Sequence, residues 1–334
     1  MRISSWSLKR SRFSRKNRKS LRRMTGFLVS LVTLLAATLL AQELKLGVSI
    51  RMLAAGYDAA TRFNSPQGIF YDRRTKELYV CDTGNHQVVI FDSTGLPVYR
   101  FKHWVERGGK KILGEPRSIA INSRGDIFLA DNLCDYLDIL NFRGESEERF
   151  DLARALNVSS AKPLLLALDE KDYLYVVYRN EKSALAVFDP DLRLVQQLEN
   201  RKENHQDFGE ISGLWVDSNI YMTDATAEPC VRVFSGDGTY LLGFGTHDVG
   251  WDGFSLPSGV TITQGGIIWI ADTFRQVVKA FSPEGMFVRY IGGYGHQAGA
   301  MDYPAALTGN GEALLFVLEK AGERFQGFEV APEE

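Results

Sequence analysis

FNSPQGIFYDRRTKELYVCDTGNHQVVIFDSTG, residues Phe63 to Gly95, decides the fold of this 334-residue chain. Within it, three short runs are rich in β-branched and aromatic residues: Gly68 to Tyr71, Glu77 to Cys81 and Gln87 to Phe91. A turn that ends the quoted stretch precedes Val98 to Phe101, which predicts a fourth strand. Because one isolated antiparallel sheet leaves both of its faces in water, neighbouring copies must bury it.

A hydrophobic strand that ends in an acidic residue recurs along the chain. Its copies are LYVCD at 78–82, IFLAD at 127–131, LYVVY at 174–178, IYMTD at 220–224, IWIAD at 268–272 and LFVLE at 315–319. Their last residues fall 49, 47, 46, 48 and 47 positions apart, close to the spacing of propeller blades. A second marker follows each copy after nine or ten residues, at Phe91, Leu140, Phe188, Phe234, Phe281 and Phe328. These markers predict an all-β protein, a six-bladed β-propeller of four-stranded antiparallel blades.

The sequence pattern P-x-G-I, followed by Y-V-x-D-T-G-N-H, resembles the NHL repeat. Pro66 to Ile69 with Asp82 to His86 carries the resemblance best, and Pro257 to Val260 with Asp272 and Thr273 is the next copy. It covers roughly residues 46 to 330, although the third copy has Tyr178 where the others have an acid. NHL repeats form β-propellers that often bind macromolecules through one face, so the resemblance implies the same fold and a binding role.

The two ends of the repeat region predict how the ring closes. The last copy stops at Phe325 to Val330, which corresponds to a third strand, while residues 45–56 resemble the fourth strands elsewhere. We therefore expect the N-terminal strand to complete the last blade, which leaves no unpaired edge in the ring.

The charge of the chain is divided unevenly. Residues 1–24 hold ten Lys or Arg and no acid, so the remaining 29 basic residues face 41 acidic ones, a net charge of −12. Such an acidic body argues against nucleic-acid binding, which relies on a basic surface to neutralise phosphates.

An apolar segment follows the basic one. Met24 to Gln42 is uncharged over nineteen positions, which suits either the h-region of an export signal or a marginal membrane anchor. We interpret residues 1–24 as a cytoplasmic n-region, residues 25–42 as the signal or anchor, and residues 43–334 as the propeller. The protein is thus expected to be exported, periplasmic or extracellular, or anchored in the inner membrane.

The three cysteines, Cys81, Cys134 and Cys230, form no C-x-x-C motif, so neither covalent haem nor any other cofactor is expected. Cys81 and Cys134 come from adjacent blades and form the one candidate disulfide; the alternative is three small buried or loop thiols.

Five acids end the second strands: Asp82, Asp131, Asp224, Asp272 and Glu319. A ring of carboxylates around a channel would suggest metal or acid–base chemistry. Recurrence in nearly every blade favours a structural role instead, because each acid precedes a turn where it can accept backbone N–H groups.

Histidines and large aromatic residues occur in the loops of one propeller face. His86 follows a second strand, whereas His103, His205, His247 and His296 lie between consecutive blades, together with Trp104, Trp251 and Tyr294. Such side chains are solvated loop residues, a binding face or, if they converge, a metal site. We choose His86, His103, Trp104, His247, Trp251, Tyr294 and His296 as the candidate partner-binding face and assign no metal or catalytic residue.

The favoured function is a monomeric protein-interaction scaffold that binds protein partners at the cell envelope. One alternative is a metal-dependent enzyme, because related propellers include a peptide-amidating lyase and lactonase-like hydrolases. The inner strands carry no His and few acids, and no G-x-S-x-G or H-E-x-x-H motif occurs, which weighs against it. The other alternative is a glycan- or cell-wall-binding module.

Overall fold

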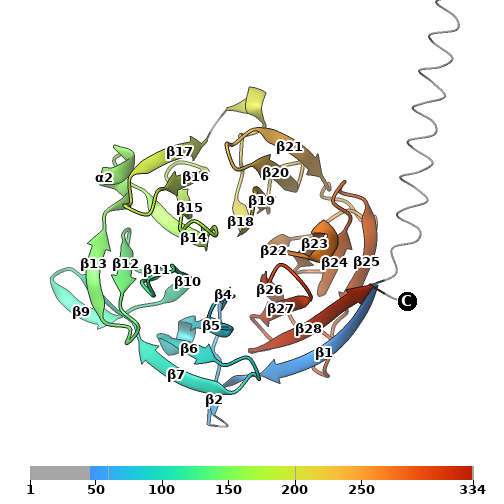
Figure 1. Ribbon diagram of the computed structural model, residues 1–334, viewed down its shortest axis with the longest axis horizontal. Coiled ribbons are helices and arrows are strands. Elements are labelled where there is room, and N and C mark those ends of the chain that lie inside the picture. The colour runs from blue at the N-terminus through green and yellow to red at the C-terminus, as the bar shows by residue number, and fades with distance from the viewer. Residues whose placement is uncertain (1–45, 59, 200, 333–334) are drawn as a thin grey trace, which may run out of the picture. The chain divides into compact units, whose positions relative to one another are not determined.

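The computed structural model describes residues 46–332 apart from 59 and 200. The chain divides into two units, Met1–Lys45 and Leu46–Glu334, and the second contains six four-stranded antiparallel sheets arranged in a ring (Figure 1). This confirms the predicted six-bladed propeller. The segments 1–24 and 25–42, interpreted above as n-region and signal or anchor, lie outside the described residues. Within residues 46–332, no helix has the length and apolar character needed to cross a membrane.

The first three blades follow one another along the chain, each with its first strand innermost (Figure 1). Blade 1 contains β4 (Gly68–Asp72), β5 (Glu77–Asp82), β6 (Gln87–Phe91) and β7 (Pro97–Lys102). Blade 2 contains β10 (Pro116–Ile121), β11 (Ile127–Asp131), β12 (Leu137–Leu140) and β13 (Ser146–Phe150). Blade 3 contains β14 (Lys162–Leu168), β15 (Leu174–Arg179), β16 (Ser183–Phe188) and β17 (Leu194–Leu198).

The next three blades repeat this order until the ring closes. Blade 4 contains β18 (Ile211–Val216), β19 (Asn219–Asp224), β20 (Val231–Ser235) and β21 (Tyr240–Phe244). Blade 5 contains β22 (Pro257–Thr263), β23 (Ile267–Asp272), β24 (Val277–Phe281) and β25 (Phe287–Gly292). Blade 6 contains β26 (Pro304–Gly309), β27 (Leu314–Glu319), β28 (Arg324–Pro332) and β1 (Leu46–Ala54).

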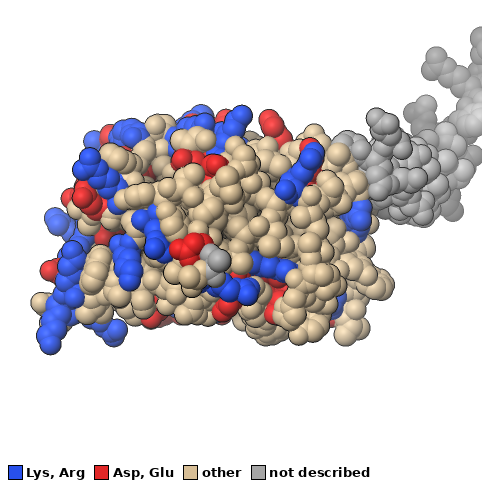
Figure 2. Space-filling view, turned by 90° about the horizontal axis from the view of Figure 1, so that it is seen from below, with Lys and Arg blue, Asp and Glu red and all other residues tan. Residues whose placement is uncertain are grey.

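Short elements occupy the connections. Two small hairpins pair β2 (Gly56–Asp58) with β3 (Thr61–Arg62) and β8 (Trp104–Arg107) with β9 (Lys110–Leu113). The short helices are η1 (Thr83–Asn85), α2 (Leu152–Leu156), η2 (Lys202–Asn204) and η3 (Gln264–Gly266). Figure 2 views the rim from below and shows Lys and Arg gathered at its left end, the side where β9 lies in Figure 1.

The ring closes by pairing the N-terminal strand with the last strand, as the sequence predicts. β1 runs antiparallel to β28 from the Leu46–Pro332 pair to the Ala54–Phe325 pair. A bulge between Ile50 and Met52 adds local twist to the outer strand. Blade 6 therefore has four strands like the others, and its outermost strand, β1, comes from the N-terminal end of the repeat region.

Both markers of the sequence repeat lie in the core. The second strands β5, β11 and β23 are buried on nearly every residue because neighbouring blades cover both faces of each sheet. The second marker, a residue of each third strand such as Phe91, Phe188 or Phe281, is also buried. Phe91 packs edge-on against Phe325 of blade 6 with ring centroids 5.0 Å apart. Each such ring stabilises the fold by about 2–3 kcal/mol through burial.

The β1–β28 pair provides a test of ring closure. A methyl group at Gly327 would lie 2.6 Å from Cγ of Met52 and 3.0 Å from Cε1 of Phe316. Gly327→Ala should therefore force β1 away from β28 and lower the free energy of unfolding by about 1–3 kcal/mol, measured by urea denaturation. Gly236→Ala is the control, since its methyl group meets only Ser218 O at 3.4 Å. Equal stability of the two variants would contradict the importance of this contact.

Candidate functional site

The antiparallel order of the strands gives the ring two different faces. The connections between blades and the turns from second to third strands emerge on one side, which we call the connection face. The turns from first to second and from third to fourth strands emerge on the other side, which we call the opposite face. All residues of the predicted partner-binding set come from segments that belong to the connection face.

The five acids at the ends of the second strands are buried at the connection face. Their carboxylates mainly fix the connection that enters the same blade, and less the hairpin that follows. In each of these connections a backbone N–H donates to the carboxylate. The bonds run from Asn64 N to the Asp82 side chain (2.7 Å), from Gly209 N to that of Asp224 (2.8 Å), from Leu256 N to that of Asp272 (3.1 Å) and from Asp302 N to that of Glu319 (2.7 Å). Asp131 accepts instead from Leu133 N in the following turn (2.8 Å).

Third-strand side chains satisfy the remaining oxygens of these acids. Gln87 Nε2 donates to Asp82 at 2.8 Å, and Lys279 Nζ lies 3.0 Å from Asp272. Asp224 pairs with Arg232 (3.1 Å) in the same way. Burial alone would raise the pKa of Asp224, but the backbone N–H groups that it accepts outweigh burial and hold its pKa below the usual value. The hydrogen bonds and ion pairs of these carboxylates thus give them a structural role.

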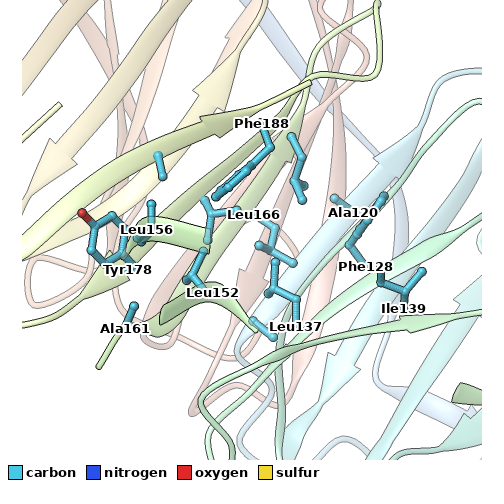
Figure 3. Close-up of a cluster of buried hydrophobic side chains, with 14 of the residues drawn as sticks. Ala120, Phe128, Leu137, Ile139, Leu152, Leu156, Ala161, Leu166, Tyr178 and Phe188 are labelled. Atoms are coloured by element: carbon cyan, nitrogen blue, oxygen red, sulfur yellow. The ribbon is translucent and has the colours of Figure 1, made fainter. Parts of the chain in front are cut away.

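Blade 3 has Tyr178 at the position where the other blades have the buried acid. Helix α2, in the connection that enters this blade, accounts for the difference. Ala155 N donates to Asp151 O and Val158 N to Ala153 O, so the entering connection satisfies its own backbone donors. Its Leu152 and Leu156 join the same buried cluster as Tyr178 (Figure 3). An aromatic ring packs against this apolar helix, whereas a carboxylate there would lack donors.

His103 differs from the sequence-based expectation, because it is buried and cannot belong to an exposed binding face. Its Nδ1 lies 2.7 Å from Asp131 Oδ2 and its Nε2 lies 3.0 Å from Asp138 Oδ2. Its side chain is 1% exposed, and both carboxylates are fully buried. Ser146 Oγ donates to the other oxygen of Asp138 at 2.5 Å. The imidazole therefore bridges two strands of blade 2.

The surroundings of His103 favour its charged form. Burial lowers the pKa of His103, but the hydrogen bonds and charges of Asp131 and Asp138 outweigh it, so the pKa lies above the usual value. For Asp131, burial would raise the pKa, yet the His103 contact and the backbone N–H groups hold it below the usual value. A protonated imidazole can donate through both ring nitrogens, as this geometry requires.

The other predicted residues fall into two groups. His86 is half-buried with Nδ1 2.7 Å from Gly114 O, and Trp104 is exposed under Lys111 at the β8–β9 hairpin. His247, Trp251, Tyr294 and His296 are exposed on the two connections that flank blade 5. Figure 1 places β9 and β25 on opposite sides of the ring, so the two groups do not form one site.

The blade 5 group includes residues that the sequence did not single out. Trp251 stacks on Tyr290 of β25 with centroids 5.5 Å apart and an angle of 5° between the rings. Phe274, in the β23–β24 turn, packs against Tyr303 at 5.7 Å. Tyr294 packs against His296 at 5.9 Å. Sequence reasoning missed Tyr290 because it occurs in a fourth strand, where an aromatic residue indicates only a β-strand.

Cationic side chains occupy inner-strand ends on the connection face. Arg117 of β10 donates to Leu164 O (3.1 Å) and to Asn132 Oδ1 (3.2 Å), and Lys162 of β14 donates to Asn132 O (2.7 Å). Among residues 46–332, apart from those left undescribed, no group of three or more His, Cys, Asp or Glu is placed to hold a metal ion. The residues present do not fit the divalent ion that the enzyme alternative would require.

All three cysteines lie in the described part of the chain, as buried free thiols. The structure thus agrees with the second alternative above and not with a Cys81–Cys134 disulfide. Burial raises the pKa of both Cys134 and Cys230 to about 12, so these thiols are protonated at neutral pH.

Comparison with known families identifies the first blade. The family model described as NHL repeat matches residues 63–91, which run from the connection before β4 to the end of β6. Residues 63–91 are thus similar to an NHL repeat. The architecture of the whole ring is consistent with NHL-repeat proteins. No curated protein matches this chain in sequence.

Solved structures share its fold at low sequence identity. A gluconolactonase from Xanthomonas campestris is 12% identical with a TM-score of 0.57, covering 80% of this chain and 86% of its own. Virginiamycin B lyase from Staphylococcus aureus is 9% identical with a TM-score of 0.56 (85% and 99%). A luciferin-regenerating enzyme is 15% identical with a TM-score of 0.57 (80% and 91%). At these identities the likeness establishes the fold alone.

The role of the buried acids can be tested at Asp272. Asp272→Asn leaves the Lys279 cation buried without its counter-charge, so we expect the free energy of unfolding to fall by about 3 kcal/mol. The double variant Asp272→Asn/Lys279→Met should recover part of this loss. Asp189→Asn is the control, because Asp189 is partly exposed and caps a turn that Asn also suits. Unchanged stability of Asp272→Asn would refute a structural role.

The raised pKa of His103 predicts that its contribution to the free energy of unfolding depends on pH. A raised folded-state pKa means that the stabilisation is complete below the unfolded pKa of about 6.5 and is lost as pH rises through the folded pKa. The Asp131 contribution has the opposite sign and is lost only in acid, as pH falls through its lowered pKa. The advantage of the wild type over His103→Gln, measured by urea unfolding, should therefore shrink above neutral pH. A difference that stays constant or grows above neutral pH would contradict this account of His103.

Proposed function

We propose that this propeller is a binding module that receives a protein partner on the connection face around blade 5. The observation that carries the proposal is the stacked pair Trp251 and Tyr290, whose side chains are 68% and 42% exposed. Tyr294, 70% exposed, follows on the next connection. Large amphipathic rings of this kind supply much of the contact energy in protein interfaces.

Two features distinguish this group from scattered surface hydrophobics. Its exposed apolar members all come from blade 5 and its two connections: Val249, Trp251, Phe274, Tyr290 and Tyr294. The Trp251–Tyr290 stack also forms within the free protein, so a partner would not have to order these side chains on binding. Isolated exposed apolar residues are common, whereas a grouped and pre-ordered set supports an interaction surface.

The connection that carries Trp251 is held in place by blade 5 itself. Arg275, in the β23–β24 turn, donates to Gly250 O (2.7 Å) and Gly253 O (3.2 Å), and Gly250 N donates to Asp248 Oδ1 (2.6 Å). Thr246 Oγ1 donates to the same carboxylate at 2.5 Å. A loop fixed in this way presents its aromatic side chain in one arrangement, which favours specific binding over loose adhesion.

The proposed place of action is the cell envelope. It rests on the sequence of residues 1–42, whose basic and apolar segments suit export or anchoring of the propeller outside the cytoplasm. The partner would then be another envelope or extracellular protein, bound to a single copy of this chain.

An enzyme is the second candidate, because the structural neighbours include a gluconolactonase and a lyase. The cationic ends at Arg117 and Lys162 and the lack of a metal-ligand cluster among the described residues favour binding instead. Metal analysis of the purified chain separates the candidates: one tightly held Ca or Zn per chain would support the enzyme.

A glycan-binding module would use the same kind of exposed ring. A glycan screen decides this alternative: binding that is lost in Trp251→Ala or in Trp104→Ala would favour it. If no glycan binds the wild type more strongly than it binds these variants, a protein partner remains the better explanation of the exposed aromatic residues.

Site-specific photo-crosslinking tests the proposal. A photoreactive phenylalanine analogue placed at Trp251 or Tyr294 in the full-length protein should give discrete protein adducts in cells, detected as mass-shifted bands. The matched control is Phe142, equally exposed at 71% but in the β12–β13 turn of the opposite face. Equal adducts at Phe142, or none at either test position, would contradict a partner-binding face at blade 5.

A further inference from the structure

The outer rim of the ring carries a basic segment on an otherwise acidic protein. Residues 97–113 comprise β7 and the β8–β9 hairpin and hold five Lys or Arg against one acid, whereas residues 25–334 as a whole have a net charge of −12. Figure 2 shows Lys and Arg gathered at this end of the rim. The five cationic side chains are all exposed: Arg100, Lys102, Arg107, Lys110 and Lys111.

These five cations are not neutralised by neighbouring acids. Within the described part of the chain, no carboxylate lies within ion-pair distance of any of them. Glu106, the one acid of the segment, pairs with Arg149 of β13 at 2.6 Å, which adds a sixth cation to the rim. Asp58 of the β2–β3 hairpin offsets part of the Arg100 charge. The segment with these neighbours therefore keeps an excess of positive charge.

Large apolar side chains are exposed beside these cations. Leu96, Val98, Tyr99 and Trp104 are between 42% and 64% exposed. The Nζ atom of Lys111 lies over the Trp104 ring, 5.7 Å from its centroid. Aromatic rings occur frequently at the boundary between membrane and water, where the alkyl stems of Lys and Arg can lie along apolar surface while their charges stay in water.

We propose that this rim binds the surface of a lipid bilayer that contains anionic phospholipids. The Lys and Arg side chains donate to the lipid phosphate groups, and Leu96, Val98 and Trp104 lie at the boundary between headgroups and acyl chains. The inference shares with the proposed function only the location at the cell envelope. The rim is separate from the partner-binding surface, because β7 and β25 lie on different sides of the ring (Figure 1).

The point where the chain enters the ring agrees with this orientation. β1 is the outermost strand of blade 6 and adjoins blade 1 on the same rim (Figure 1). A Cβ atom at Gly95, in the β6–β7 turn, would lie 3.3 Å from Cβ of Met52 in β1. In the sequence, residues 43–45 alone separate β1 from the uncharged segment 24–42. A retained membrane anchor would thus raise the effective concentration of lipid at this rim.

The combination of cations and apolar side chains sets the class of partner. A nucleic acid would pair with the cations but would leave Leu96 and Val98 in water. A purely apolar partner would cover Lys110 and Lys111 without supplying a counter-charge, which is costly. A bilayer with anionic headgroups satisfies both sets of side chains at once.

Site-specific fluorescence of the full-length protein in vesicles tests the proposal. Val98→Cys carries a nitrobenzoxadiazole label, and Leu241→Cys, 52% exposed in β21 across the ring, is the matched control. The native thiols are buried, so the label reacts with the introduced one. In phosphatidylcholine vesicles with about 30% phosphatidylglycerol, the label at residue 98 should shift to the blue and gain about twofold in intensity, and the label at residue 241 should do neither. Residues 1–45 are the same in both proteins, so the comparison does not depend on them.

Charge variants in the Val98→Cys background test the role of the hairpin. Lys110→Ala/Lys111→Ala should remove most of the gain, because each basic residue near an anionic surface contributes about fivefold to binding. Lys171→Ala/Lys182→Ala, which removes two exposed Lys from turns of blade 3, should retain it. No response at residue 98, an equal response at residue 241, or a full response in Lys110→Ala/Lys111→Ala would overturn the proposal. A larger response at residue 98 to double-stranded RNA than to vesicles would assign the rim to nucleic acid and overturn it as well.

Discussion

A buried carboxylate at the end of the second strand is the interaction on which the regularity of this ring depends. Asp82, Asp224, Asp272 and Glu319 each bind backbone N–H groups of the connection that enters their own blade. Because the connection leads directly into the innermost strand, the carboxylate fixes where that strand begins. The recurring acids thus have a structural role, and the proposed binding surface consists of other residues.

Sequence reasoning succeeded where one blade repeats another. The acid at Asp82 and the ring at Phe91 recur at blade spacing because every blade needs the same anchor and the same buried contact, so they predict the architecture. It failed where a blade departs from the pattern. The burial of His103 depends on the β8–β9 insertion and on Asp138, and the exchange at Tyr178 depends on helix α2. The spacing of residues does not reveal such local compensation.

The candidate sites were predictable to different degrees. Loop position alone assigns Trp251 and Tyr294 to the connection face, but their grouping with Tyr290 depends on the register of blade 5. A cavity on the opposite face had no sequence signal, because the Arg73 and Trp215 residues that line it belong to blades 1 and 4 and meet only across the closed ring. The two faces therefore differ in character: one carries a group of exposed aromatic rings, and the other holds a cavity between the inner strands.

Closure of the ring by β1 and β28 also makes the fold a check on the completeness of the chain. β1 is the first strand of the ring to be synthesised and its partner is the last, so β1 has no edge to pair with until translation has passed residue 332. A chain that stops early keeps open strand edges at blade 6, and such edges pair with other chains and cause aggregation of incompletely folded proteins. Only the complete set of blades removes these open edges. In a truncated chain β1 lacks its partner β28 and remains unpaired, whereas in the complete chain the same strand closes the ring.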